Sequence, residues 1–129
     1  MTSTLTDLVK LAGETNEKNG YNGYGKARED GYGIEYLTKK DLLEVGEICE
    51  ALEELRHGHP ADEIYYSADD KLEGYLIEKF DAAIRNFGTI YEVAQEHGMD
   101  LENTLAYLQS KIEYNARRAD TKASGVKAF

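Results

Sequence analysis

The feature that most constrains this chain is the placement of its helix-breaking residues. The chain has 129 residues but only one proline, and half of its 12 glycines lie between residues 13 and 33. Proline interrupts a helix and internal glycine weakens one, so the stretches that lack both favour long helices. A chain of this length also predicts a single domain, here residues 1–129. The sequence therefore predicts an all-α fold that is interrupted by one large loop.

Four segments place apolar residues three and four positions apart, as on one face of a helix. Residues that favour helix caps mark their ends, such as Thr4 with Asp7 and, later in the chain, Asp100. These signals predict four helices: one from Thr4 to just before Asn19, one from Thr38 to near His57, one from Ser67 or Asp70 to Gly98, and one from Asp100 to near Arg118.

The connections complete the predicted architecture. Residues 60–70 are expected to link the second and third helices, and residues 119–129 to form a tail. The connection at Gly98 is short, so the last two helices are expected to be antiparallel neighbours. The simplest arrangement is a bundle of four to five helices.

Residues 20–36 are rich in glycine and tyrosine and follow neither a helical nor a strand period. Aromatic side chains can be buried, so the segment is expected to be an ordered loop rather than a disordered one. It is not a dinucleotide-binding fingerprint, because no strand precedes it. Two roles remain open: a loop that stacks a tyrosine on a substrate base, or a purely structural loop.

The net charge limits the classes of partner. The chain has 25 acidic and 15 basic residues, which gives a formal net charge of −10. Such a chain repels the phosphate backbone of nucleic acids and the anionic surface of membranes, so neither is expected as a partner. A small phosphorylated substrate fits where a divalent cation reverses the local field. The single cysteine, Cys49, excludes an internal disulfide, and without a signal-peptide pattern a cytoplasmic location is expected.

Two pairs of acidic residues mark the candidate site. Glu44 and Glu47 lie three residues apart on the second predicted helix, and Glu78 and Asp81 have the same spacing on the third. Each pair flanks an apolar stripe, so packing of the two stripes would bring four carboxylates together, where their repulsion is relieved by partial protonation or, more commonly, by a divalent cation. Oxygen ligands favour Mg²⁺, with Mn²⁺ as a substitute, and the lack of a Glu-x-x-His pair disfavours iron. The alternative is two solvated acidic faces that never meet.

Basic residues supply candidate phosphate contacts. On the fourth predicted helix they share a polar face with an amide: Lys111, Asn115 and Arg118. The alternative for the two cations is a favourable interaction with the helix dipole. Arg85, four residues after Asp81, is expected either to pair with that acid or to contact substrate. Lys39 and Lys40 are expected on the surface, the alternative being contact with a bound triphosphate.

Three stretches carry a family resemblance. Residues 43–56 read LEVGEICEALEELR, residues 78–85 read EKFDAAIR, and residues 111–118 read KIEYNARR. In this order they resemble the first acidic helix, the E-x-x-D helix and the K-x-x-x-N-x-x-R ending of MazG-like nucleoside triphosphate pyrophosphohydrolases. The likeness covers about residues 38–118 and extends to the first predicted helix. It departs at Leu43, where the family usually has the first glutamate of E-E-x-x-E, and in a long gap between the acidic motifs.

The resemblance implies a helical bundle that assembles as a dimer or tetramer and uses Mg²⁺. The implied metal ligands and catalytic residues are Glu44, Glu47, Glu78 and Asp81. Water would attack the α-phosphorus of an NTP or dNTP to release the monophosphate and pyrophosphate, with Lys111 and Arg118 on the phosphates. The tyrosines favour a purine substrate such as GTP or dGTP, because they offer a stacking surface. The rival hypothesis is a catalytically silent helical interaction module that kept the fold.

Overall fold

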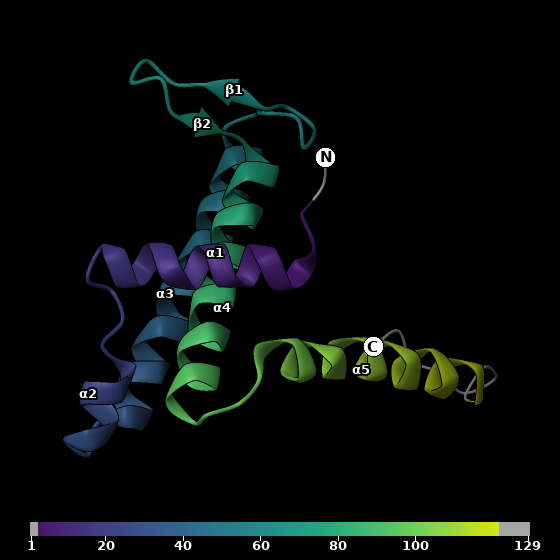
Figure 1. The fold of residues 1–129 in the computed structure, drawn as a ribbon. Coiled ribbons are helices and arrows are strands. Elements are labelled where there is room, and N and C mark those ends of the chain that lie inside the picture. Colours follow the sequence, from purple (N-terminus) through teal and green to yellow (C-terminus); the bar gives the residue numbers. More distant parts are fainter. Residues whose placement is uncertain (1–2, 122–129) are drawn as a thin grey trace.

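The computed structural model describes residues 3–121, which are mostly helical (Figure 1). Its elements are, in order, α1 (Leu5–Lys18), α2 (Tyr24–Glu29), α3 (Gly33–Arg56), β1 (Tyr65–Tyr66), β2 (Leu72–Glu73), α4 (Tyr75–Glu96) and α5 (Leu101–Thr121). The two short strands pair antiparallel, with Tyr65 opposite Glu73. The predicted all-α class is confirmed, with a small hairpin added. Every helix within residues 3–121 is too short or too polar to cross a membrane.

The antiparallel pair of α3 and α4 forms the centre of the fold, and α1 crosses α4 (Figure 1). The short helix α2 packs at the end of this pair away from the hairpin. Buried apolar residues lie at the contacts between these four helices: Val9, Tyr24, Ala51, Ala82, Tyr91 and Ala94. Several of them are small, which allows the helix backbones to approach closely.

Gly13 on α1 is one such close approach, because a Cβ at this position would overlap the ring of Tyr91 on α4. Gly13→Ala is therefore expected to lower the free energy of unfolding by about 1–3 kcal/mol through overpacking. Gly46 is the matched control, since it also lies inside a helix but a Cβ there meets no atom within 4 Å. Gly46→Ala is expected to raise the free energy of unfolding by about 0.5–1 kcal/mol. Urea denaturation measures both, and a loss of stability in both variants would contradict this account of Gly13.

Two helix starts depend on local capping, and both are confirmed. At the start of α1, the Asp7 N–H donates to Thr4 Oγ1 (3.1 Å) and the Thr4 N–H donates to Asp7 Oδ2 (3.3 Å). At the start of α5, the Asn103 N–H donates to Asp100 Oδ2 (3.0 Å). These bonds satisfy backbone donors that the first turn of a helix leaves unpaired.

The prediction of a loop over residues 20–36 is wrong. This segment contains α2, and α3 begins at Gly33 rather than at Thr38. Tertiary contacts give the reason: Tyr24 is buried, and its N–H donates to Glu92 Oε1 on α4 (3.1 Å). Packing against α4 thus overrides the weak helix propensity of glycine.

The predicted connector over residues 60–70 contains half of the hairpin, and α4 begins at Tyr75 rather than at Ser67 or Asp70. Ser67 closes the hairpin instead, because its Oγ accepts two backbone N–H groups of the turn at 3.3 Å. Gly74 precedes α4 with a φ of 132°, a backbone conformation that favours glycine.

The predicted antiparallel packing of the last two helices is also wrong. The chain turns at Gly98, which has a φ of 64°, and α5 then extends away from α3 and α4 (Figure 1). Its apolar stripe stays largely exposed, as at Leu108 and Ile112. The helix continues to Thr121, so residues 119–121 of the predicted tail are helical, and residues 122–129 lie outside the described part of the chain.

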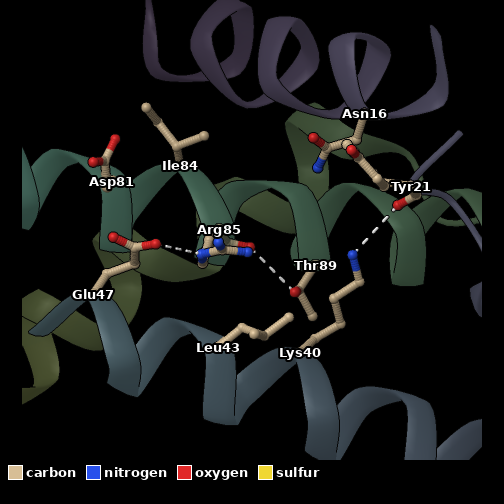
Figure 2. Close-up of a pocket in the computed structure, with 9 residues that line it drawn as sticks. All are labelled: Asn16, Tyr21, Lys40, Leu43, Glu47, Asp81, Ile84, Arg85 and Thr89. Carbon is tan, nitrogen blue, oxygen red and sulfur yellow. Dashed lines mark hydrogen bonds and ion pairs between the residues drawn. The ribbon is translucent and has the colours of Figure 1, made fainter. Parts of the chain in front are cut away.

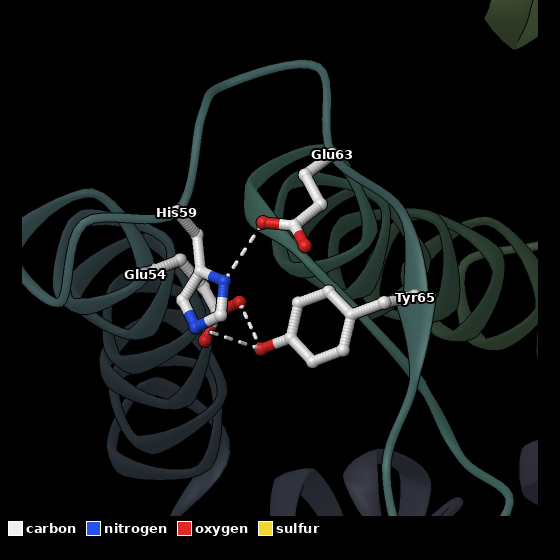
Figure 3. Close-up of polar contacts among 4 residues, drawn as sticks. All are labelled: Glu54, His59, Glu63 and Tyr65. Carbon is white, nitrogen blue, oxygen red and sulfur yellow. Dashed lines mark hydrogen bonds and ion pairs between the residues drawn. The ribbon is translucent and has the colours of Figure 1, made fainter.

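Side chains at the base of the hairpin tie it to α3 (Figure 3). The Tyr65 hydroxyl donates to Glu54 Oε1 (2.6 Å), and the rings of Tyr65 and His59 stack with their centroids 4.7 Å apart. His59 Nδ1 lies 2.8 Å from Glu63 Oε1. Hydrogen bonding to Glu54 and burial raise the pKa of Tyr65 to about 12, so the hydroxyl keeps its proton. This network fixes the hairpin to the end of α3, one of the two helices that carry the acidic motifs.

Candidate active site

Acidic side chains of α3 and α4 come together in the half of this helix pair that is nearer the hairpin. One carboxylate oxygen from each of Glu47, Glu50 and Glu78 lies within 4.8 Å of the other two. Asp81 lies three residues after Glu78 on α4 and lines the same cavity as Glu47 (Figure 2). We call these four residues the acid cluster. The structure thus brings together three of the four predicted ligands, Glu47, Glu78 and Asp81, and adds Glu50.

Glu78 is the buried member of the acid cluster. The residue is only 6% exposed, and its Oε2 has no hydrogen-bond partner among residues 3–121. Burial, together with hydrogen bonding to Glu50 and repulsion by it, raises the pKa of Glu78 to about 7. Burial and the charge of Glu47 also raise the pKa of Asp81, an effect that Lys71 partly offsets. Carboxylates in this position are costly when charged, and a divalent cation would remove that cost.

Glu44 lies outside the acid cluster, contrary to the prediction. Asn86 Nδ2 donates to its Oε1 at 3.2 Å, which directs this side chain toward the next turn of α4. The prediction treated Glu44 and Glu47 as equal partners of the α4 acids. Because α3 and α4 run antiparallel, a residue earlier on α3 lies beside a residue later on α4. Glu44 therefore contacts Asn86 rather than Glu78.

Arg85 is bound to Glu47 rather than to Asp81. Its Nε donates to Glu47 Oε1 at 2.9 Å, and the Glu47 side chain is only 14% exposed. The hypothesis that Arg85 pairs with the acid one turn before it on the same helix is therefore wrong. The bond between helices leaves the guanidinium at the wall of the cavity (Figure 2).

A cavity of about 520 Å³ runs from the acid cluster along α4 (Figure 2). Glu47 and Asp81 line one end, and Asn16 and Tyr21 line the other. Lys40, which was expected on the surface, lines the cavity too, and its Nζ donates to the backbone oxygen of Tyr21 at 3.4 Å. The glycine- and tyrosine-rich segment therefore reaches the cavity through Tyr21.

The predicted phosphate contacts do not join the acid cluster within one chain. These residues, Lys111, Asn115 and Arg118, lie on α5, which begins beyond the end of α4 opposite Glu78 and extends outward (Figure 1). Lys111 Nζ lies 5.1 Å from the ring centroid of Tyr114, on its own helix. The prediction assumed that α5 folds back along α4, and the turn at Gly98 directs it elsewhere.

Sequence reasoning missed Glu50 as a residue of this site, favoured a surface position for Lys40, and left a contact from the tyrosine-rich segment open without singling out Tyr21. A signal for Glu50 was available, because it continues the three-residue spacing of Glu44 and Glu47. The positions of Lys40 and Tyr21 depend on how α1, α3 and their connection pack, so the sequence could not decide between the alternatives for them.

The arrangement combines oxygen ligands at one end with cationic side chains, Arg85 and Lys40, along the cavity wall. Hard divalent cations prefer such oxygen ligands, and cationic side chains bind phosphate oxygens. The site therefore suits a metal ion next to a phosphorylated ligand. Comparison of the chain with protein-family models, with characterised proteins and with solved structures finds no match.

Proposed function

We propose that this chain is a Mg²⁺-dependent, MazG-like pyrophosphohydrolase that converts an NTP or dNTP to the monophosphate and pyrophosphate. The observation that carries the proposal is the acid cluster, in which a buried carboxylate oxygen of Glu78 lacks a partner beside other acids. The order of the acidic motifs supports the same family. The adjoining cavity supports a ligand of nucleotide size, because its volume lies in the range of small-molecule sites.

The side chains of the site have distinct roles in this proposal. Mg²⁺ would be held by the acid cluster, and by Glu44 if its side chain turns from Asn86 toward the cluster. When bound, the ion lowers the pKa of the attacking water and neutralises charge on the triphosphate. A carboxylate of the cluster accepts the proton as the water oxygen bonds to the α-phosphorus and the bond to pyrophosphate breaks. Arg85 and Lys40 bind phosphate oxygens along the cavity.

The direct test is to incubate the protein with each NTP and dNTP in Mg²⁺ or Mn²⁺ and to separate the products. Monophosphate and pyrophosphate in equal amounts are expected, with a purine such as GTP or dGTP as the best substrate. Release of orthophosphate instead would place the attack at another phosphorus. A chain that turns over none of these nucleotides would be a silent interaction module, and the enzymatic proposal would fail. A nucleotide substrate and the unpaired Cys49 both suit a cytoplasmic location.

We further propose that the protein works as a homodimer or homotetramer. Large apolar side chains are exposed along several helices, among them Leu11 (61%), Ile34 (80%), Leu42 (64%) and Ile112 (59%). Apolar surface of this extent on a single chain supports burial in an interface. In such an assembly, Lys111, Asn115 and Arg118 of one subunit would contact phosphates bound by another subunit.

Analytical ultracentrifugation tests this assembly directly. A sedimenting mass of two or four times the 14.5 kDa chain is expected. Leu42→Glu is expected to shift the population toward the monomer if α3 is part of the interface, because it buries a charge there. A monomer for the unaltered protein at all concentrations would contradict the proposal.

A further inference from the structure

We infer that the end of the cavity away from the acid cluster recognises the nucleobase, through a hydrogen bond from Asn16 and stacking on Tyr21. This inference rests on the proposed function, because it assigns the part of the substrate that the acid cluster does not bind. Neither residue belongs to the acidic or basic motifs. Both come from the N-terminal part of the chain, outside the three stretches that carry the family resemblance.

The position of the two ends fixes the direction of a bound nucleotide. Asp81 and Thr89 both line the cavity from α4, eight residues apart, which corresponds to about 12 Å along the helix axis. Arg85 lies halfway between them. A triphosphate held at the acid cluster would therefore pass Arg85 and leave its nucleoside beside Thr89, where Asn16 and Tyr21 lie (Figure 2).

Asn16 has an unused amide in this position. The side chain is partly buried, and it approaches α4 closely because a Cβ on Gly88 would overlap its Nδ2. Within residues 3–121 its amide group makes no hydrogen bond. An amide offers one acceptor and a donor side by side, which matches the paired donor and acceptor on the edge of a base. A base would thus satisfy a polar group that the described residues leave unpaired.

Tyr21 has a fixed backbone and an accessible ring. Its N–H donates to the Asn16 backbone oxygen at 2.8 Å, and its own oxygen accepts from Lys40 Nζ at 3.4 Å. The residue is nevertheless 62% exposed, so the ring remains available to a ligand. Aromatic rings stack on every type of base, whereas an amide distinguishes between base edges. Tyr21 therefore supplies affinity and Asn16 supplies discrimination.

The test measures binding rather than turnover, by calorimetry with the non-hydrolysable α,β-methylene analogues of the four NTPs and with inorganic tripolyphosphate, all in Mg²⁺. Asn16→Ala is expected to weaken the preferred analogue by about tenfold and to reduce the preference among bases. Tyr21→Leu is expected to weaken all four analogues by about tenfold, and Tyr21→Phe to restore them. Tripolyphosphate, which has no base, is expected to bind every variant equally.

Two matched controls separate base recognition from general damage. Asn22→Ala removes an amide that lines a different pocket, and Tyr32→Leu removes a ring with the same 62% exposure outside the cavity. Both are expected to bind all ligands as the unaltered protein does. If the analogues bind but Asn16→Ala and Tyr21→Leu leave base preference and affinity unchanged, or weaken tripolyphosphate as much as the analogues, the inference is overturned and the proposed function stands. If neither tripolyphosphate nor any analogue binds, both fail.

Discussion

Glu47→Gln and Asp81→Asn are each expected to reduce the rate of nucleotide hydrolysis by at least about 10³-fold, while the domain stays folded. Each change keeps the size of the side chain and removes the charge that a divalent cation needs. The cost in stability is small, because Glu47 loses only a partly exposed ion pair with Arg85 and such pairs contribute about 0–1 kcal/mol. Pyrophosphate release measures the rate, and thermal unfolding followed by circular dichroism measures the fold.

Glu53→Gln is the matched control for this experiment. Glu53 lies on the same helix and bonds Arg56 at 2.9 Å, the same distance at which Glu47 bonds Arg85, but it is not part of the acid cluster. Its loss should leave the rate unchanged. Near-normal hydrolysis by either the Glu47 or the Asp81 variant would show that the assignment of metal ligands is wrong.

The second large effect distinguishes two buried glutamates on α4 that have similar exposure but different partners. Glu78 is 6% exposed and has an unpaired oxygen, whereas Glu92 is 7% exposed and accepts hydrogen bonds from the Tyr24 N–H (3.1 Å) and the Tyr36 hydroxyl (2.9 Å). In metal-free protein at pH 8, Glu78→Gln is expected to raise the melting temperature and Glu92→Gln to lower it. Each kcal/mol corresponds to about 4 °C in a domain of this size.

The pH dependence follows from the direction of the shift at Glu78. Its pKa of about 7 in the folded protein lies above the ordinary value of 4.5, so the folded protein binds this proton more tightly than the unfolded chain does. The stability that this proton contributes is complete below pH 4.5 and is lost as the pH rises through 7. The advantage of Glu78→Gln should therefore be large at pH 8 and nearly absent at pH 5.

Mg²⁺ should reverse the order of stability that is expected for these variants in the metal-free protein. Bound at 100 times its Kd, an ion that binds only the folded state adds about 2.7 kcal/mol to the unaltered protein. Glu78→Gln should lose most of that gain, whereas Glu92→Gln should keep it. Equal stabilisation of both variants by Mg²⁺, or a Glu78→Gln variant less stable than the unaltered protein at pH 8 without metal, would contradict the role given to Glu78.

Features that depend on local interactions could be predicted from the sequence. The starts of α1 and α5 follow from caps within three residues, at Thr4 with Asp7 and at Asp100. The acidic pairs were visible because residues three apart share a helix face. These predictions needed no knowledge of which helices are neighbours.

Features that depend on tertiary contacts could not be predicted in the same way. Glycine-rich α2 is helical because Tyr24 packs on α4, and the direction of α5 depends on one backbone turn at Gly98. The pairing of α3 with α4 places Glu50 in the acid cluster and Glu44 outside it, and this register is a property of two helices together. Spacing along a single helix contains no information about it.

The Arg85 guanidinium pairs with Glu47, so it competes with a metal ion for this carboxylate of the acid cluster. A divalent cation that takes Glu47 Oε1 displaces a group that lies 2.9 Å from it. The released guanidinium would remain at the cavity wall, where it would meet the phosphates of the proposed nucleotide substrate. Metal and nucleotide should therefore bind cooperatively, and by thermodynamic reciprocity each should increase the affinity of the other by the same factor.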